Sequence, residues 1–252
     1  MKTTRSLSLA YDYIRNKIIS SEFPPGSRLT TRSLSMETGV SRTPIRDALR
    51  LLEKEGLVEI QPRVGASVKA FDFLTFEEVC ELRLGLESFS AALAAEKRTF
   101  TELVEIESAC LAMGELIKGW RVSGNPELGL ELRRRDIRFH FAIATAAHNR
   151  EVLREIMRLQ IVFHMACGPM PADVATDEKL ILEREEAQAA HCRIFEAIRD
   201  REHANARREM QQHMQEGHDR ALILIARRER QQAVANVTLP ILGRPAWPHA
   251  PA

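Results

Sequence analysis

The sequence has few aromatic residues and no long run of uncharged apolar residues. Aromatic side chains make up 6% of the chain, although its apolar content is 44%. A composition poor in aromatics and rich in Leu, Ala, Glu and Arg favours helix over sheet. No uncharged segment is long enough to cross a bilayer, and Asp12, Arg15 and Lys17 interrupt the first apolar stretch, where a signal peptide needs a continuous core. We therefore expect a cytoplasmic protein without a membrane partner.

Cysteine is also scarce. The four cysteines are Cys80, Cys110, Cys167 and Cys192. No two of them are close in the sequence, so the paired spacing of a zinc finger is missing. We expect most of them to be small buried residues in a reducing compartment.

The chain lacks a strong net charge, which is +1 and by itself argues against nucleic acid as a partner. The charge is unevenly distributed, however. Residues 1–73 contain 12 basic and 8 acidic side chains, and the remainder contains 24 and 27. The length suits two domains. A basic first third followed by a slightly acidic remainder is typical of a DNA-binding domain joined to a domain that does not touch DNA.

Residues 30–65 are the most informative stretch, because they predict two short helices, a tight turn and a β-hairpin. Thr30 and Ser41 are good N-caps, and Gly39 supplies the backbone freedom for a sharp turn between the helices. One face of the second helix is apolar through Ile45, Leu49 and Leu52. After this helix, one strand begins near residue 57 and another returns over residues 66–69. The pattern is that of a winged helix-turn-helix.

In a winged helix-turn-helix the start of the second helix enters the major groove of DNA. Here that start carries Ser41, Arg42, Thr43 and Arg46. Arginines and hydroxyls suit phosphate oxygens and guanine edges. The alternative is a surface helix with solvated arginines. The order of cap, turn, basic helix start and wing favours the DNA interpretation.

Three motifs here, PPGSRL, GVSRTPIRDALRLLEKEGLV and PRVGASV, resemble the DNA-binding domain of the GntR superfamily of bacterial transcription regulators. The resemblance covers residues 7–68. It implies DNA contacts at Arg32, Ser41, Arg42, Thr43, Arg46 and Gly65. We expect Arg63, in the wing, to add a phosphate contact.

The rest of the chain predicts an all-helical bundle. Capping boxes at Thr75 with Glu78 and at Thr99 with Glu102 open its first two helices. The predicted helices are residues 7–20, preceded by a loose polar start, then 75–97, 99–121, 126–147, 149–167, 177–199 and 201–230. The fold class is therefore mainly α. A winged helix-turn-helix domain with a small β-hairpin wing occupies residues 1–70, a linker 71–75, a C-terminal all-α bundle 76–230, and a flexible proline-containing tail 231–252.

Four polar residues of the bundle could hold a divalent metal. Asp136 and His140 are four apart and so lie on one helix face. If the last two helices are antiparallel, His191 and His213 lie at similar distances from the turn between them. One carboxylate and three imidazoles suit zinc or nickel, or manganese with added water. The alternative is that these histidines are surface or satisfied core residues.

The bundle also resembles the FCD domain of the FadR-like branch of the superfamily, through ELRLGLE, DIRFHFAIATAAHN, HCRIFEAIRD and HMQ. The resemblance implies a divalent metal bound by Asp136, His140, His191 and His213. It also implies that Arg83 meets the carboxylate of an effector. An intrahelical pair between Arg83 and Glu87 is an equal alternative. Asn149 either lines the effector site or caps its helix. The remaining histidines, treated as non-ligands, are His148, His164, His203 and His218.

Taken together, these features predict a metabolite-responsive transcription regulator and repressor. We expect a homodimer on palindromic operator DNA. Its effector would be a small organic acid bound near the metal, and the connector at residues 70–74 would transmit its effect. One alternative is a metal-dependent enzyme acting on a small organic acid. Another is a regulator whose metal is purely structural or is itself the signal.

Overall fold

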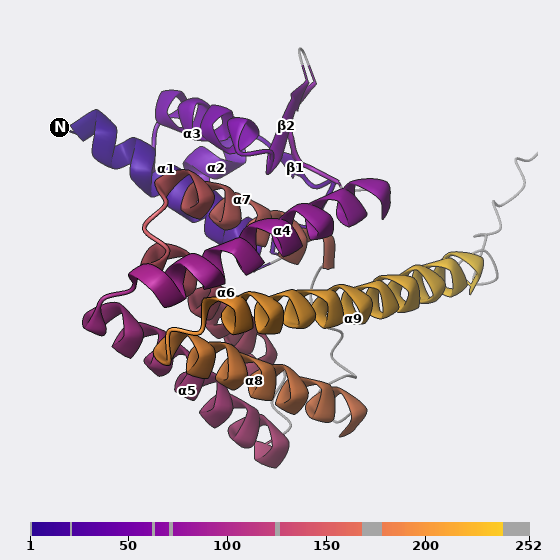
Figure 1. Cartoon of the computed structure of the whole chain (residues 1–252). Coiled ribbons are helices and arrows are strands. Elements are labelled where there is room, and N and C mark those ends of the chain that lie inside the picture. The colour runs from indigo at the N-terminus through magenta and orange to yellow at the C-terminus, as the bar shows by residue number, and fades with distance from the viewer. Residues whose placement is uncertain are drawn as a thin grey trace, which may run out of the picture.

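The computed structural model describes residues 2–20, 22–61, 64–70, 73–123, 127–167 and 178–238. Within these ranges the protein is mainly α-helical with one small sheet, as predicted (Figure 1). The helices are α1 Lys2–Ile19, α2 Thr31–Thr38, α3 Arg42–Lys54, α4 Phe73–Lys97, α5 Phe100–Ser123, α6 Glu127–Ala146, α7 Arg150–Cys167, α8 Glu178–Arg199 and α9 His203–Thr238. The strands are β1 Arg28–Leu29, β2 Val58–Gln61 and β3 Gly65–Val68.

The turn between α2 and α3 forms as its residues predict. The Thr30 hydroxyl accepts a hydrogen bond from the Ser33 backbone N–H at 3.1 Å and so caps α2. Gly39 ends α2 with φ 68°, a left-handed backbone conformation that residues with a Cβ atom rarely adopt. Ser41 occupies the N-cap of α3, but its side chain makes no capping hydrogen bond.

The wing is part of a three-stranded antiparallel sheet with strand order β1-β3-β2, and not a hairpin alone. β1 pairs with β3 through Arg28 opposite Ser67 and Leu29 opposite Ala66. A strand of two residues is too short to produce an alternating pattern, so the sequence did not predict it.

Helix α7 belongs to two parts of the molecule. The core of the winged domain (the helices and strands of residues 2–70) contains Ile14 of α1 and Leu49 of α3, both fully buried or nearly so. Four residues of α7 complete the same core, namely Leu159, Ile161, Val162 and Met165. We call this the shared core. Because it joins the winged domain to the bundle by side-chain packing, the two are connected by more than the chain between β3 and α4. Figure 1 shows α7 lying between the winged domain and the other bundle helices.

Small residues allow the helices of the bundle to approach closely. In α4, Ala91, Ala94 and Ala95 are buried and pack in one cluster with Phe139 of α6 and Met210 of α9. Helix α4 lies along α9, and α8 lies against both α9 and α5. Alanines on α4 thus leave room for the larger side chains of neighbouring helices.

Several predicted helix boundaries need correction. The chain is already helical from Lys2, where a loose start was expected. Helix α4 begins at Phe73, so Thr75 lies within it and does not form its N-cap. Helix α9 continues to Thr238, so the first part of the expected tail is helical. The capping box at Thr99 and Glu102 is confirmed by reciprocal hydrogen bonds of 2.8 and 3.2 Å.

Some predictions fall where the structure gives no description. They concern the start of the helix expected over residues 126–147, the residues between the helices expected over 149–167 and 177–199, and residues 239–252 of the expected tail. In the part of the chain that is described, no helix is both long and apolar enough to span a bilayer.

The left-handed turn at Gly39 can be tested by substitution. We expect Gly39→Ala to lower the free energy of unfolding by about 1 kcal/mol, because a Cβ disfavours positive φ even though no atom lies within 4 Å of it. Gly85 is a matched control, since it lies within α4 and its Cβ position is equally open. Gly85→Ala should leave stability unchanged or raise it. Denaturant unfolding of both variants gives the comparison, and equal effects would contradict the strain at Gly39.

Candidate nucleic-acid interface and metal centre

The start of α3 presents its polar side chains to solvent because its opposite face is used for packing. Ile45, Ala48 and Leu49 are buried in the shared core. Arg42 and Arg46 consequently point outward and are exposed, as are the hydroxyl residues beside them. Among the described residues, no ion pair neutralises either arginine. Two free guanidinium groups at a helix start can bind phosphate oxygens or guanine edges.

Two other predicted contacts also lie on the surface. Arg32 is exposed on α2 and, in the described part of the chain, has no ion pair. Gly65 is exposed at the start of β3 with φ 120°, a conformation that favours glycine. Arg63 lies outside the described residues. One supporting residue was not predicted: Arg28 donates a hydrogen bond to the Val64 carbonyl at 2.8 Å, which holds the wing tip against β1.

The four predicted metal ligands converge in the bundle. Asp136 and His140 come from α6, His191 from α8 and His213 from α9, and one ligand atom of each lies within 4.8 Å of the other three. The three histidines are buried, with exposed fractions of 6% or less, and Asp136 is partly buried. The helical spacing and the antiparallel pairing of α8 with α9 thus place these groups together, as expected.

The separations within this Asp–His cluster match those of ligands around one ion. His191 Nε2 lies 3.0 Å from His213 Nε2, which lies 3.3 Å from His140 Nε2. Asp136 Oδ1 lies 3.7 Å from His191 Nε2. Nitrogens about 2.0–2.1 Å from a tetrahedral zinc are about 3.3 Å apart. The same nitrogen of each ring faces the centre, so a cation there could accept all three lone pairs.

Electrostatics favours the metal-binding protonation states of three of the four residues, His191, His213 and Asp136. Burial lowers the pKa of His191 to about 3, and it lowers the pKa of His213 well below its usual value. Both imidazoles are therefore neutral, which is the form that binds metal. Burial opposes ionisation of Asp136, but His140 and His191 outweigh it and lower the pKa of the carboxyl group. The cluster therefore offers one anionic carboxylate and two neutral imidazoles, with His140 as the remaining candidate ligand.

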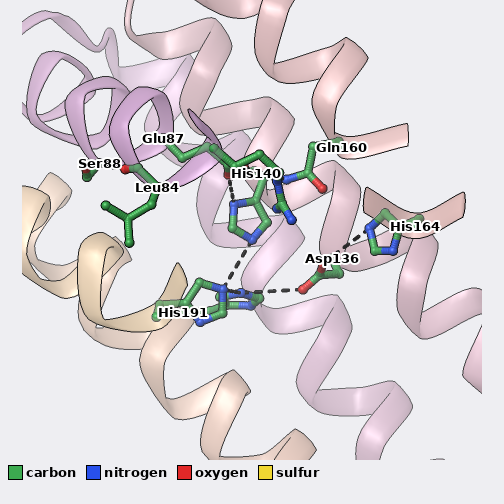
Figure 2. A network of polar contacts seen from close by, with 10 residues as sticks. Leu84, Glu87, Ser88, Asp136, His140, Gln160, His164 and His191 are labelled. Carbon is green, nitrogen blue, oxygen red and sulfur yellow. Dashed lines mark hydrogen bonds and ion pairs between the residues drawn. The ribbon is translucent and has the colours of Figure 1, made fainter. Parts of the chain in front are cut away.

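A second layer of side chains surrounds the cluster. Glu87 of α4 forms an ion pair with Nδ1 of His140, the ring nitrogen that faces away from the centre (Figure 2). Burial would lower the pKa of His140, but the Glu87 carboxylate raises it overall. The ring of Phe139 stacks on His191, with ring centroids 4.2 Å apart. His164 Nε2 lies 3.9 Å from Asp136 Oδ2, outside the four-residue cluster. The sequence did not predict that Glu87 and Phe139 lie beside the cluster, and it placed His164 among the non-ligands.

The two predicted effector residues have partners of their own. Arg83 is 3% exposed, and its Nε donates to Glu87 Oε1 at 2.9 Å, so the intrahelical alternative forms. Its guanidinium group also lies 4.1 Å from the centroid of the Phe163 ring. Asn149 Oδ1 accepts a hydrogen bond from the Val152 N–H at 3.2 Å and caps α7. A role of either residue in effector binding stays a prediction.

Comparison with known proteins identifies the family. Residues 8–68 match the family model described as "Bacterial regulatory proteins, gntR family". Residues 78–216 match the model of the FCD domain, which therefore covers more than half of the chain. This chain belongs to the GntR family and carries an FCD domain.

Relatives of this GntR-family protein are named as regulators and not as enzymes. The Uxu operon transcriptional regulator of Escherichia coli K12 is 29% identical over 243 residues, covering 88% of this chain and 90% of that protein. The gluconate operon transcriptional repressor of Bacillus subtilis is 29% identical over 147 residues, covering 58% and 56%. Several other relatives are matched over between 52% and 66% of their own length.

A solved structure described as E. coli McbR/YncC is similar in fold, with a TM-score of 0.68. The alignment covers 88% of this chain and 98% of that one at 21% sequence identity. At that identity the likeness supports the fold of this GntR-family protein and nothing about its ligands.

The Asp–His cluster predicts stoichiometric metal binding that depends on its histidines. We expect His191→Ala combined with His213→Ala to abolish retention of Zn²⁺ or Ni²⁺, because two of four ligands are lost. The matched control replaces two exposed histidines away from the cluster, His148→Ala with His203→Ala. Native mass spectrometry and metal analysis of protein purified without chelator give the metal content. Full occupancy in the first double variant would exclude this cluster as the binding site.

Proposed function

We propose that this protein is a cytoplasmic transcription repressor whose affinity for operator DNA is controlled by a small carboxylate bound near a divalent metal. One observation carries the proposal: α7 contributes to the core behind the arginine-bearing α3 and also contacts the residues around the Asp–His cluster. A DNA-binding face and a candidate ligand site are thereby joined through one helix. The name of the gluconate operon transcriptional repressor supports repression, and gluconate, which that name contains, is a small carboxylate.

The DNA-binding residues of the proposal are the exposed group on the winged domain. They are Arg32, Ser41, Arg42, Thr43, Arg46, Arg63 and Gly65. Arg42 and Arg46 are exposed and have no ion pair in the part of the chain that the structure describes, which supports contacts made by α3 in the major groove. Gly65, beside the wing tip, supports a second contact to the backbone of the duplex. We assign DNA binding to residues 1–70, and effector binding and dimerisation to residues 76–230.

A homodimer would present two such faces to a palindromic operator. Apolar side chains on the surface of the bundle support a partner of that kind. In α5, Phe100 is 77% exposed, Val104 45% and Leu111 63%. Their spacing of four and seven residues places them on one side of the helix. An exposed apolar stripe on a bundle is a common protein–protein contact.

The charges around the proposed metal favour an anionic effector. Asp136 and Glu87 each carry one negative charge and Arg83 carries one positive charge, so a divalent ion leaves a surplus of one positive charge in a largely buried site. Two buried polar atoms beside it, His164 Nε2 and Gln160 Oε1, have no hydrogen-bond partner among the described residues. A small hydroxy acid would suit this site, because its carboxylate could bind the metal and the guanidinium of Arg83 while its hydroxyl group donated a hydrogen bond to Gln160 Oε1.

The effector can weaken DNA binding only if it binds one arrangement of the two domains more tightly than another. The short connector before α4 was the expected route between the domains. The shared core adds a second route, because a shift of α7 at Gln160 or His164 also moves the side chains that pack behind α1. The proposed switch is therefore a movement of α7.

Two alternatives are kept for specific reasons. A metal with His and Asp ligands could activate water, as in a metal-dependent enzyme. The regulator names of the relatives and the exposed α3 argue against this. A regulator with a structural or sensory metal is supported by the closed character of the cluster, since four protein ligands can complete a tetrahedral zinc site.

Arg46 provides a direct test of the proposed DNA face. We expect Arg46→Ala to weaken binding to a duplex enriched from a random library by about 10-fold or more, because a bidentate guanine contact is worth about 1–3 kcal/mol. Arg50 is the matched control, since it is exposed one turn later on α3 and lies 4.0 Å from Asp47. Arg50→Ala should change affinity by about twofold or less. Equal affinities of wild type and Arg46→Ala would contradict this orientation of α3.

Removing the metal separates the three interpretations of the cluster. We expect chelator treatment alone to change operator affinity little, and D-gluconate or lactate to weaken operator binding only in metal-loaded protein. Fluorescence anisotropy of a labelled duplex gives both measurements. A chelator effect without any response to acids would favour a metal sensor, and turnover of an acid would favour an enzyme.

A further inference from the structure

Glu87 is a buried carboxylate at the meeting point of α4, α6 and α7. It is 2% exposed, which would strongly disfavour its charge if it stood alone. Its Oε1 accepts from Arg83 Nε at 2.9 Å, and its two oxygens lie 3.2 and 3.3 Å from Gln160 Nε2. Its Oε2 pairs with His140 Nδ1. Three donors from three helices thus converge on one side chain.

The contact with His140 is made at the nitrogen that the metal would not use. Nε2 of His140 faces His213 Nε2 at 3.3 Å, inside the Asp–His cluster, and Nδ1 faces the Glu87 carboxylate. Figure 2 shows the His140 ring between Glu87 on one side and the other cluster residues on the opposite side. A carboxylate at Nδ1 keeps the proton there and leaves the Nε2 lone pair free for a cation.

His140 is distinct among the three histidines in this respect. Its Nδ1 forms an ion pair with a carboxylate, whereas among the described residues the buried Nδ1 atoms of His191 and His213 make neither an ion pair nor a hydrogen bond. The tautomer and ring orientation of His140 are therefore held by an anionic side chain, whereas those two rings are held by packing, including the stack of Phe139 on His191.

We propose that Glu87 is a positioning residue for the metal. It holds His140 in the tautomer and orientation that bind the ion, and it connects that ligand to Arg83 and to Gln160 of α7. The inference rests on the proposed metal site. It also gives a physical link between effector and metal: an anion that binds Arg83 competes with Glu87, so the carboxylate shifts toward His140 and Gln160. The metal and the effector would then bind cooperatively, because both act on the Glu87 side chain.

The test is Glu87→Gln, which keeps the shape and removes the charge. We expect affinity for Zn²⁺ and for Ni²⁺ to fall by about 10–100-fold, as is typical when the outer partner of a ligating histidine is lost. Competition with a chromophoric chelator measures both. Glu102→Gln is the matched control, because Glu102 pairs with His148 Nε2 at 3.0 Å away from the cluster. Its metal affinity should equal that of wild type.

A double-mutant cycle separates positioning from general support of the fold. In a His140→Ala background, Glu87→Gln should cause no further loss of Ni²⁺ affinity, because the group through which Glu87 acts is absent. A purely structural role would cause the same loss in both backgrounds. The Co²⁺ absorption spectrum of Glu87→Gln should also change, since one ligand is reoriented.

Removing one member of a buried charge pair can prevent folding. In that case Arg83→Met combined with Glu87→Gln removes both charges together and should still lose metal affinity, whereas the Glu102→Gln control should retain it. Unchanged affinity and an unchanged Co²⁺ spectrum in Glu87→Gln would overturn the inference and leave the metal site intact. Absence of metal from the wild type would instead overturn the proposed function.

Discussion

Burial of the Glu87 carboxylate is tolerated because positive and polar groups face it, and this requirement connects the helices of the bundle. Arg83 lies one turn earlier on α4, His140 on α6 and Gln160 on α7. Burial raises the pKa of Glu87, but Arg83 and His140 outweigh it and lower the pKa overall. The charge is therefore permanent. Moving α6 away from α4 separates the Glu87–His140 pair in a region of low dielectric constant, whereas moving α7 breaks only the hydrogen bonds of the uncharged Gln160.

Local sequence signals were sufficient for the helix-turn-helix and for bringing together the four residues of the Asp–His cluster. Gly39 and Thr30 act within one turn of the chain, and their roles follow from the conformations that each residue type favours. Asp136 and His140 share a helix face through the period of the helix. His191 and His213 required one further assumption, the antiparallel pairing of α8 and α9, which the structure has.

The parts that could not be predicted depend on contacts between distant segments. β1 gains its identity only by pairing with β3, and Gln160 reaches Glu87 across 73 residues of chain. The cysteines give another example: Cys110 and Cys192 are far apart in the sequence, yet their Sγ atoms lie 3.4 Å apart where α5 meets α8. Burial and this contact raise the pKa of Cys110 to about 12. Spacing in the sequence carries no information about such helix registers.

The participation of α7 in the shared core limits how this architecture can be rearranged. Leu159 and Ile161 fill space that the first seventy residues leave open, so those residues on their own would carry an uncovered apolar area prone to self-association. A chimera that exchanges the winged domain between relatives must also exchange the face of α7 that packs against it. Recombination between the winged domain and the bundle would otherwise create voids or clashes in the shared core. This favours inheritance of the winged domain together with its own α7.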